Sequence, residues 1–543
     1  MRQFHCDLLI IGGGAAGSRA AYEAKKIHPD LKVVMAVAGD YGTSGSTNLI
    51  ASESLGINAP FDYMGDGDSP DIYYQDMIET GGGLSDPHLC RTIADEACER
   101  VKELIDLGLE FDKKDGRIIQ RKLSGCTKAR SLTCGGSTGR EMVRVLKKGI
   151  VRLGVEVLEN VRVLDLLKDE QGRICGAIAS SDRTPFTIGT KSVVLASGGA
   201  GRIFRHNVNP PSLEGDGWCM AYRAGARLIN MEFFQIGPAV FNPHIMFIIH
   251  SHMWRLRPRL TNALGEEFLS RYCPLGVDPT EVIALKAMSY PFSVQTAAKY
   301  LDIAIFKEVM SGRGTEVGGI YFDVTHVGQD ALLERAPITY KTLKQAGADL
   351  AEERIEIGMA VQNFNGGILI EANGFTGIEG LYAAGEVTGG VHGADRPGGN
   401  NLIDTQVFGY RAGRAAADYA SNTNQKPVRI DIPGAFKFEP PSPEDEMLIA
   451  RSADLYYSNL TILRTKTGLE EILQLIDSHR SNRNLIVKNR MILGAILATA
   501  ALTREESRGT HYREDFPQNN PAWVKRLVIS YKGEVTPAVD IVA

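Results

Sequence analysis

The first forty or so residues alternate between apolar runs and a glycine-rich turn in the order strand, helix, strand. Two short apolar runs, Asp7–Ile11 and Lys32–Val37, flank a glycine turn at residues 12–17 and a stretch of good helix formers, Ser18–Lys26. A strand, a tight turn and a helix that lead to a second strand are typical of a dinucleotide-binding unit. This pattern predicts an α/β fold with a parallel, Rossmann-like sheet.

Helical periodicity and strand-like alternation continue farther along the chain. Apolar residues recur at helical spacing from Asp86 to Leu109, and a second helix is predicted at Thr138–Leu153. Alternating strands follow near Val155–Leu167 and Ile174–Ala179, and Ser192–Ser197 has the continuous apolar pattern of a buried strand. The predicted sheet therefore gains strands from segments that are far apart in sequence.

The composition changes twice along the chain, which predicts an insertion and a separate C-terminal part. Aromatic, proline and charged residues are interspersed from residue 239 to 350, whereas the glycine-rich style returns at 380–399. The apolar spacing in 469–476 and 492–502 is typical of a small helix bundle. We predict a first domain made of residues 1–238 and 351–425, an inserted α+β domain at 239–350, and a C-terminal helical domain and tail at 426–543.

Charge and cysteine content exclude several classes of function. The chain has 60 lysines and arginines against 65 aspartates and glutamates, and this formal net charge of −5 is too mild to predict a nucleic-acid partner. Its eight cysteines include no Cys-x-x-Cys pair, so neither a metal site nor a disulfide framework is predicted. No targeting signal and no run of about 20 apolar residues is seen, which predicts a cytoplasmic protein without direct membrane insertion.

Gly12, Gly14 and Gly17 have the spacing of a dinucleotide-binding turn. The first glycine allows a tight turn, the second lets the backbone approach a pyrophosphate, and the third lets the helix pack closely against the strand. Because the motif follows a predicted strand and opens a predicted helix, it predicts a dinucleotide site. An acidic residue that binds the ribose is expected about 20 positions later, and Asp40 is the nearest candidate, just beyond the strand end at Val37.

Further motifs occur in order over essentially the whole chain. They are GSTNLIAS (45–52), VLASGGAG (194–201), EGDGWCMAYRAGA (214–226), GLYAAGE (380–386), VHGADRPGGNNL (391–402) and EESRGTHYREDFP (505–517). Together they resemble the flavoprotein subunit family of succinate dehydrogenase, fumarate reductase and L-aspartate oxidase. The resemblance implies FAD as the cofactor, a split FAD-binding domain, a capping domain as the insertion, and a C-terminal helical domain.

The resemblance also implies cofactor contacts. Asp216 would lie near the FAD, Glu386 would hold ribityl or ribose hydroxyls, and the backbone around Leu402 would meet the isoalloxazine. Some family members attach FAD through a histidine in the segment that resembles 45–52, and since this chain has no histidine there we predict noncovalent FAD. The predicted cofactor-binding residues are Gly12, Gly14, Ala15, Ala16, Gly17, Asp40, Ser44, Gly45, Ser46, Thr47, Asn48, Ala196, Ser197, Gly198, Asp216, Gly385, Glu386, Asn401, Leu402 and Ile403.

Arg396 in the motif HGADRPGG resembles the family's carboxylate-binding arginine. Its planar guanidinium suits a bidentate carboxylate, so we predict that it binds an anionic substrate. The alternative is a structural arginine paired with Asp395. His392 lies in the same motif and is a further candidate, for which packing or a role beside the flavin is favoured over catalysis.

Other substrate-site positions depart from the family pattern. Gly237 and Gln362 stand where the family has substrate histidines, and Ala298 stands where it has the arginine that delivers a proton. The adjacent Lys299 would serve as the acid after a one-residue shift of register. Losing a placed general acid typically costs about 10²–10⁴-fold in rate, so simple fumarate or succinate turnover is not expected.

The segment HSHMWRLRPR at residues 250–259 places two histidines and three arginines beside a tryptophan. It would suit an anionic or extended substrate at the edge of the cap. A solvated or partner-facing basic strip explains the same residues equally well.

These observations predict a FAD-dependent oxidoreductase that exchanges two electrons with an anionic organic substrate other than fumarate. The alternative is an electron-transferring flavoprotein subunit whose partner is an iron–sulfur protein, since the sequence contains no iron–sulfur motif. A third hypothesis is an adenylylsulfate-reductase-like activity, which is based on the segment AAYEAKKIHPDLKVV (20–34).

Overall fold

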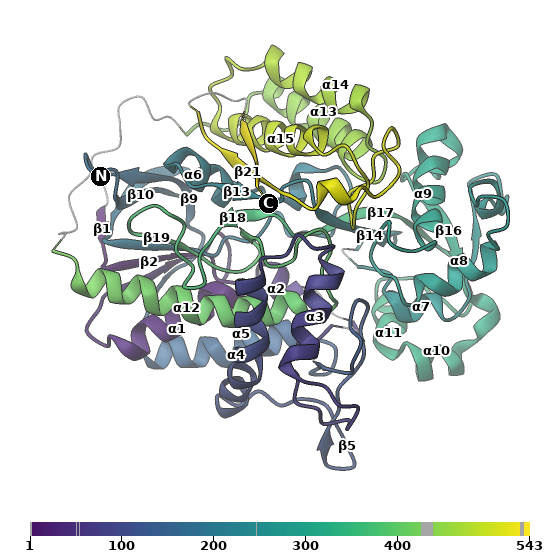
Figure 1. Cartoon of the computed structure of the whole chain (residues 1–543), viewed down its shortest axis with the longest axis horizontal. Helices are drawn as coiled ribbons and strands as arrows, with labels where there is room; N and C mark the ends of the chain where they lie inside the picture. The colour runs from purple at the N-terminus through teal and green to yellow at the C-terminus, as the bar shows by residue number, and fades with distance from the viewer. Residues whose placement is uncertain are drawn as a thin grey trace.

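The computed structural model describes residues 3–49, 52–53, 55–245, 247–424, 438–532 and 537–542. The predicted domain boundary between residues 425 and 426 lies outside these ranges. Figure 1 shows an α/β body, the inserted segment to its right and a group of C-terminal helices above the body.

The body is built on a five-stranded parallel sheet in the order β19-β12-β2-β3-β8. Strand β2 (Leu8–Ile11) leads through the glycine turn into α1 (Ala15–Ile27), and β3 (Val33–Ala36) completes the predicted strand–helix–strand unit. Every residue of β2 and β3 is buried, as expected for parallel strands that are covered on both faces. The α/β prediction is confirmed, and the remaining strands are β8 (Glu156–Leu158), β12 (Ser192–Leu195) and β19 (Leu381–Ala383).

Two long helices cover one face of this sheet side by side, α1 and α12 (Asn400–Asn422) (Figure 1). They approach closely because glycines of α12 face α1: a Cβ at Gly413 would lie 2.4 Å from the carbonyl oxygen of Ala20. This contact joins the N-terminal unit to a segment that follows the insertion, so the split first domain is closed by helix packing as well as by β19.

The predicted helices of the first domain are present. Helix α4 (Pro87–Asp106) begins after Asp86, whose carboxylate accepts hydrogen bonds from the first free backbone amides of the helix. Helix α5 (Thr138–Arg152) is the second. The strand predicted near 155–167 is two strands, because Asn160 has a left-handed φ of +55° and ends β8 before β9 (Arg162–Lys168) begins in another sheet.

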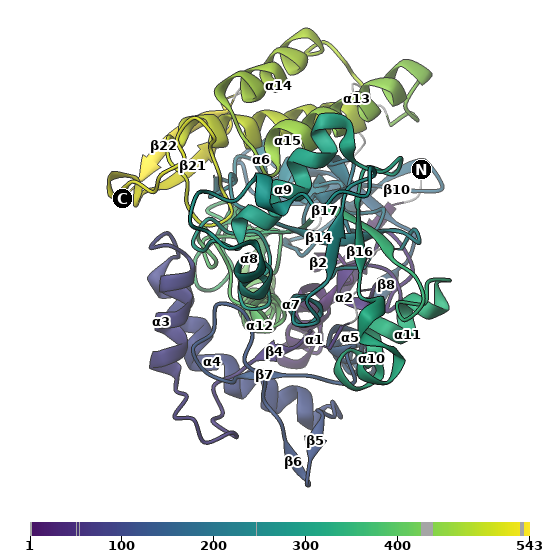
Figure 2. The same cartoon turned by 90° about the vertical axis from the view of Figure 1, so that its right-hand side faces the viewer.

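The inserted segment is a mixed α/β lobe on an antiparallel sheet, ordered β14-β17-β16-β15 (Figure 2). Its sheet begins at Phe234, earlier than the predicted boundary at 239, because β14 pairs with β17 along its whole length. The elements are β14 (Phe234–Asn242), α7 (Ser251–Trp254), β15 (Arg259–Thr261), α8 (Pro279–Lys286), α9 (Lys299–Glu308), β16 (Ile320–Asp323), α10 (Gln329–Arg335), α11 (Pro337–Gln345) and β17 (Ile355–Phe364).

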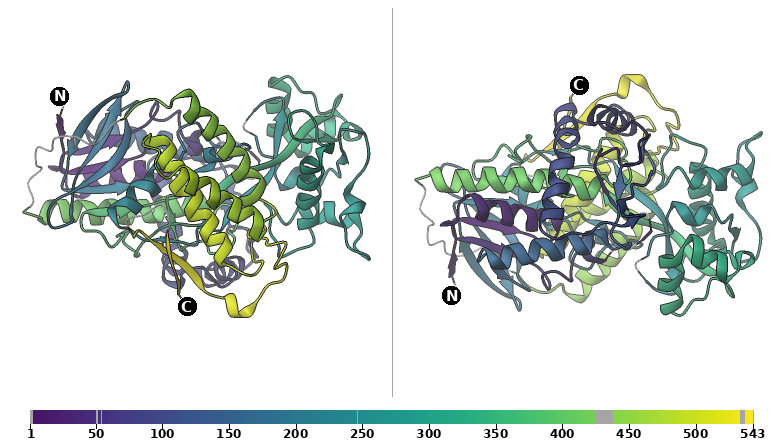
Figure 3. Two further views of the ribbon diagram at one scale, coloured as in Figure 1. Left: turned by 90° about the horizontal axis from the view of Figure 1, so that it is seen from above. Right: turned by 90° about the horizontal axis from the view of Figure 1, so that it is seen from below.

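The C-terminal part contains the predicted helices and also strands. Helices α13 (Pro443–Leu460), α14 (Lys466–Ser478) and α15 (Leu485–Thr503) pack together over the body (Figure 3). Strands β21 (Arg526–Ser530) and β22 (Ala538–Val542) then extend a small sheet that contains β13 (Leu228–Ile229), β18 (Gly367–Leu369) and β20 (Thr388–Gly389). The tail is therefore built into the first domain.

The expectation that no segment is apolar enough to cross a membrane is wrong for helix α15. Of the described residues, Leu485–Thr503 alone meets the criterion of length and composition, with a mean hydropathy of 1.6. Within the structure 72% of this segment is buried, and it packs against α13 and α14. Its apolar character is that of a core helix, for which the same composition is typical.

Candidate functional site

A long cavity lies at the carboxyl ends of β2, β12 and β19, which is where ligands bind in open α/β sheets. Its wall runs from the glycine turn at 12–14 past residues 44–47 and 196–198 toward the insertion. The lobe contributes His250 and Tyr290 to the far end. The cavity is thus shared between the body and the inserted lobe.

The glycine turn is packed so tightly that side chains are excluded. A Cβ at Gly12, which has φ +114°, would lie 2.2 Å from the carbonyl oxygen of Ala196, and a Cβ at Gly17 would lie 2.0 Å from that of Gly12. Gly14 is the residue before α1 and lines the cavity, and a Cβ there would lie 3.4 Å from Oγ1 of Thr47. The N-terminus of α1 therefore presents backbone amides where a pyrophosphate would be stabilised.

Polar atoms along the wall have no hydrogen-bond partner within the described chain. The hydroxyls of Ser46 and Ser197 are buried, line the cavity and are unpaired. Gly45, between Ser44 and Ser46, has φ +88° and no atom near the position of a Cβ. Unpaired donors beside a sterically open backbone fit FAD, whose ring edges and side chain are rich in hydrogen-bonding groups.

Two buried carboxyl groups face the same cavity. Burial raises the pKa of Glu386 to about 7, although this carboxyl accepts a hydrogen bond from the backbone amide of Phe364 at 3.2 Å. Burial also raises the pKa of Asp404 to about 7, and its Oδ1 has no partner among the described residues. Ribityl or ribose hydroxyls would stabilise either carboxylate by donating hydrogen bonds. Asp404 was missed from the sequence; its closeness to the motif at 391–402 was the only signal.

Asp216 lies at the cavity wall and is fixed by two partners. Its carboxylate accepts hydrogen bonds from Arg162 at 2.7 Å and from Asn489 of α15 at 3.0 Å. Arg162 also pairs with Glu214, so its charge is fully matched within the protein. The C-terminal helices therefore take part in positioning one wall of the predicted cofactor site.

Most of the predicted cofactor residues meet at this cavity. Gly17 and Gly385 lie behind the wall, where they allow close packing of α1, and the side chain of Asp40 accepts a hydrogen bond from Asn160 at 3.1 Å outside the cavity. Asn48 and Ile403 are also behind the wall. The lining residues are Gly12, Gly14, Ala15, Ala16, Ser44, Gly45, Ser46, Thr47, Ala196, Ser197, Gly198, Asp216, Glu386, Asn401 and Leu402.

Arg396 lines the far end of the cavity and is only 8% exposed. Its Nε and Nη2 donate to Oε1 of Gln235 at 3.1 and 2.7 Å, and its Nη1 donates to the carbonyl oxygen of Pro397 at 2.8 Å. The guanidinium is not paired with Asp395, whose carboxylate instead accepts from the backbone amide of Arg396. A guanidinium has five N–H donors, so two remain for a ligand.

Two predicted catalytic candidates are not brought to the cavity wall. His392 is buried behind it, and desolvation together with the charge of Arg396 holds the pKa of its imidazole well below the usual range. Lys299 lies at the start of α9 with its ammonium 5.4 Å from the ring of Tyr300, and it does not line the cavity. Gln362, the third candidate, does line it.

Tyr290 occupies the space that Gly237 leaves open. A Cβ at Gly237 would lie 2.6 Å from the phenol oxygen of Tyr290. That hydroxyl donates to Oε1 of Gln362 at 3.2 Å, and both side chains line the cavity. Sequence reasoning missed Tyr290 because it comes from the turn after α8, and no local pattern marks that turn as facing the cavity.

A buried ion pair lies behind Tyr290. Lys286 of α8 binds Asp302 of α9 at 2.5 Å, and both side chains are fully buried. The ammonium lies 5.5 Å from the centroid of the Tyr290 ring. Burial lowers the pKa of Lys286 and raises that of Asp302 to about 6. Lys286 therefore lies close behind the cavity, and Asp302 already balances its charge.

The basic strip at 250–259 is divided between cavity and surface. His250 lines the cavity, and its Nε2 is buried without a partner in the described chain. Arg255, Arg257 and Arg259 are exposed. The three arginines are thus at the surface, and only His250 of this group of basic residues lies where it could face a ligand.

Glu53 joins the body to the inserted lobe. Its carboxylate binds His252 at 3.1 Å and accepts hydrogen bonds from the backbone amides of Ile338 and Thr339 at the start of α11. Burial alone would raise the pKa of Glu53, but the hydrogen bond and charge of His252 and the Thr339 amide outweigh it and hold the pKa at about 2.

We expect Glu53→Gln to lower the stability of the protein by about 1–3 kcal/mol at neutral pH. Because the pKa of Glu53 is depressed in the folded state, this contribution is present above the ordinary value near 4.5 and is lost as the pH falls toward about 2. Urea unfolding of both proteins at several pH values measures the difference. Glu267→Gln, at an exposed pair with Arg259, is the control. A difference that grows on acidification would contradict the assignment.

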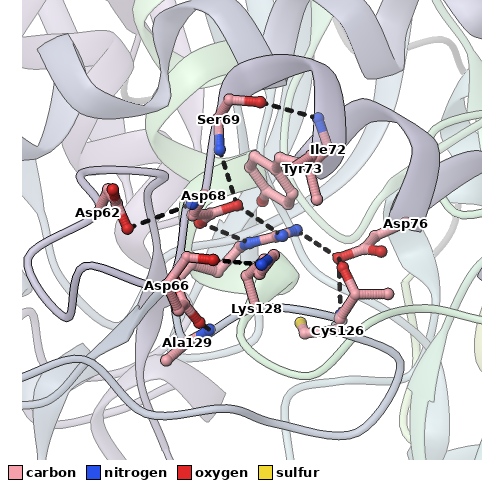
Figure 4. A network of polar contacts seen from close by, with 12 residues as sticks. Asp62, Asp66, Asp68, Ser69, Ile72, Tyr73, Asp76, Cys126, Lys128 and Ala129 are labelled. Carbon is pink, nitrogen blue, oxygen red and sulfur yellow. Dashed lines mark hydrogen bonds and ion pairs between the residues drawn. The ribbon is translucent and has the colours of Figure 1, made fainter.

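A network of polar contacts connects Asp68, Tyr73, Asp76 and their neighbours (Figure 4). Arg130 is fully buried and pairs with Asp68 at 2.9 Å and Asp76 at 2.8 Å, and its guanidinium lies 4.6 Å from the centroid of the Tyr73 ring. The Tyr73 hydroxyl donates to Oδ1 of Asn400 at 2.8 Å, at the start of α12. The network therefore anchors the turn before α12. The glycines of this turn line the cavity.

Family comparisons agree with this fold and site. Residues 7–402 match the family model described as FAD binding domain, and residues 481–541 match the one described as fumarate reductase flavoprotein C-term. The fold and the site thus define a FAD-dependent oxidoreductase. The chain belongs to the fumarate reductase and succinate dehydrogenase flavoprotein family, as the motifs predicted, and FAD is its cofactor.

Relatives of this chain span almost its full length. It is 34% identical to one of the subunits of the fumarate reductase (CoM/CoB) of Methanothermobacter marburgensis, over 98% of both chains. It is 29% identical to L-aspartate oxidase of Caulobacter vibrioides, over 96% of this chain and 95% of the relative. Sdh1 of Mycobacterium smegmatis has a similar structure, with a TM-score of 0.84, 28% identity, and coverage of 100% of this chain and 94% of the other.

The residues at the cavity also predict how FAD is held. Ser46 and Thr47 line it, and no histidine lies in the stretch 44–47. We therefore expect acid precipitation of the purified protein to release the yellow chromophore into the supernatant, where absorbance measures it. Chromophore that stays on the polypeptide would contradict noncovalent binding.

Proposed function

We propose that this protein exchanges two electrons between FAD and an anionic organic substrate other than fumarate, whose carboxylate binds Arg396. The observation that carries the proposal is the buried guanidinium of Arg396, which lines the cavity and makes hydrogen bonds only to neutral groups. A buried charge is costly unless it is paired. A substrate carboxylate would provide that pairing through the two free N–H groups.

Some residues around the site orient Arg396, and others cover the far end of the cavity. When bound, FAD supplies the capacity to accept or donate two electrons. Gln235 and Pro397 hold the guanidinium of Arg396 in one orientation, and the inserted lobe covers the far end with Tyr290 and Pro291. Because the guanidinium is itself 8% exposed, its attraction to an anion is stronger than it would be in open water.

The departures from the family pattern support a substrate other than fumarate. Gly237 and Ala298 carry no hydrogen-bonding side chain, and Gln362 is neutral, so the three family groups that hold and protonate a dicarboxylate are missing. The structure offers Tyr290 and His250 in the same part of the cavity, which is a different set of donors.

Anaerobic photoreduction followed by reoxidation tests this proposal. The reduced protein would be mixed with a panel of enoates, amino acids, adenylylsulfate and fumarate while the flavin absorbance is recorded. We expect rapid reoxidation by an anionic compound other than fumarate. Rapid reoxidation by fumarate alone would contradict the substrate assignment, and no reoxidation by any small molecule would contradict the enzymatic proposal.

We further propose that an iron–sulfur protein exchanges electrons with this flavoprotein. The support is that relatives are named as subunits, among them the Methanothermobacter marburgensis protein and the 8-methylmenaquinol:fumarate reductase flavoprotein subunit of Wolinella succinogenes. Purification from the native source would test it, with iron and acid-labile sulfide expected in a partner that coelutes with the flavin. A flavoprotein that purifies alone and free of iron would contradict it.

A further inference from the structure

We propose that the substrate of this enzyme carries a single carboxylate, which binds Arg396, and a neutral hydrogen-bonding group at its other end, which binds Tyr290, Gln362 and His250. This inference rests on the proposed function and specifies its substrate class. The three side chains are called the neutral triad below.

The neutral triad is assembled from three separate elements of the inserted lobe. Tyr290 follows α8, Gln362 lies on β17, and His250 directly precedes α7. The phenol of Tyr290 donates to Gln362 at 3.2 Å, and the ring centroids of His250 and Tyr290 are 5.5 Å apart. All three side chains line the same cavity as Arg396.

The position of Tyr290 depends on the absence of a side chain at Gly237. A Cβ there would lie 2.6 Å from the phenol oxygen and 2.9 Å from the adjacent ring carbon. Any larger residue at 237 would therefore displace Tyr290 from Gln362. Gly237 thus leaves room for the phenol of Tyr290, which places an uncharged hydroxyl at this end of the cavity.

The neutral triad can both donate and accept hydrogen bonds. Gln362 uses its Oε1 to accept from Tyr290, so its amide N–H groups remain available as donors. The phenol oxygen retains lone pairs that accept, and Nε2 of His250 is buried without a partner in the described chain. An amide or hydroxyl both donates and accepts, and so it satisfies such a set, whereas a carboxylate only accepts and would face the phenol lone pairs.

The charges around the triad also disfavour a second carboxylate. Of the described residues that line the cavity, only Arg162, His250 and Arg396 are basic, and Arg162 is paired with Glu214 and Asp216. Burial lowers the pKa of His250 to about 3, so its imidazole is neutral at physiological pH. Lys286 lies behind Tyr290 and is neutralised by Asp302. The charge of Arg396 also acts on Tyr290, and because the first carboxylate already pairs with this guanidinium, a second carboxylate would be buried without a cation of its own, which is costly.

Binding of matched ligands to the oxidised holoenzyme tests the inference. Fumarate, its half-amide fumaramate and its diamide fumaramide have nearly the same shape and differ only in charge. Titration followed by the flavin absorbance change gives the dissociation constants. We expect fumaramate to bind at least tenfold more tightly than either fumarate or fumaramide, since only the half-amide matches both ends.

Two variants assign the effect to the triad. Tyr290→Phe should weaken fumaramate binding about tenfold, as expected for the loss of one hydrogen-bonding group, and change fumarate binding much less. Gln362→Lys should reverse the preference in favour of fumarate, because it supplies the missing cation. FAD content, measured after acid release, verifies that both variants keep the cofactor site.

The outcomes separate this inference from the proposed function. Tighter binding of fumarate than of fumaramate by the unaltered enzyme would overturn the single-carboxylate inference and leave an anionic substrate at Arg396 in place. Binding of fumaramide as tight as that of fumaramate would show that no carboxylate is needed, which overturns both. The absence of any absorbance change with all three ligands would overturn the single-carboxylate inference, and the proposed function would then stand or fall on the photoreduction assay described above.

Discussion

Arg396→Met is expected to reduce kcat/KM for substrate-dependent reoxidation of the flavin by about 10²–10³-fold while the protein still binds FAD. Hydrogen bonds to charged groups contribute about 1.5–3 kcal/mol each, and 1.4 kcal/mol corresponds to a factor of ten. The guanidinium has two N–H groups without a partner among the described residues, so a carboxylate held by both would lose about 3–6 kcal/mol, and the lower part of this range corresponds to the expected loss of rate. Stopped-flow absorbance on the photoreduced protein measures the rate.

The design includes variants that separate charge from geometry. Arg396→Lys keeps a cation but not the planar fork, and it should retain only part of the activity. Arg259→Met removes an exposed arginine of the inserted lobe, and we expect a rate close to that of the unaltered enzyme. If Arg396→Met reoxidises as fast as the unaltered protein with the same substrate, Arg396 does not bind the carboxylate.

Arg504→Met is expected to lower the free energy of unfolding by about 3–5 kcal/mol. Arg504 follows α15 and is fully buried, with Nε 2.7 Å from Glu232 and Nη1 2.9 Å from Glu506. It also donates to the carbonyl oxygens of Trp523 and Lys525, so it holds the tail to the body. Methionine fills a similar volume but leaves the buried carboxylate of Glu232 without its cation, whereas Glu506 keeps its pairing with Arg508.

Urea unfolding at saturating FAD, followed by tryptophan fluorescence, measures this loss. Arg205→Met removes an exposed ion pair with Asp454 and serves as the control, for which a change below about 1 kcal/mol is expected. A loss for Arg504→Met no larger than that of the control would show that the tail is held mainly by β21 and its neighbours.

The cofactor half of the site was largely determined by local sequence. The turn Gly12-x-Gly14-x-x-Gly17 occurs between an apolar run and a helix, so the chemistry of a few adjacent residues fixes both the backbone conformation and the approach to a pyrophosphate. The ordered motifs then implied FAD and the split domain, and the family match confirms FAD. Asp40 shows the limit of such local reasoning, because its side chain turns toward Asn160.

The substrate half of the site was decided by tertiary structure. The sequence showed that Gly237, Gln362 and Ala298 depart from the family pattern, but it pointed to Lys299, thirteen positions after the lysine that packs behind the cavity. Tyr290 and His250 come together at the cavity because α7 packs on α8, and Tyr290 meets Gln362 of β17 there through a hydrogen bond.

The sequence by itself thus determined the fold class and the cofactor, and it pointed to Arg396 as the candidate anion-binding residue. Only the tertiary structure showed that the guanidinium is held by neutral Gln235, and that the space vacated at Gly237 is filled by the phenol of Tyr290. The physical reason is the sequence separation of the interacting residues. A glycine turn is specified by steric contacts between residues that are close together in the sequence. The charge balance and shape of a pocket depend instead on packing between distant segments, which no local pattern records.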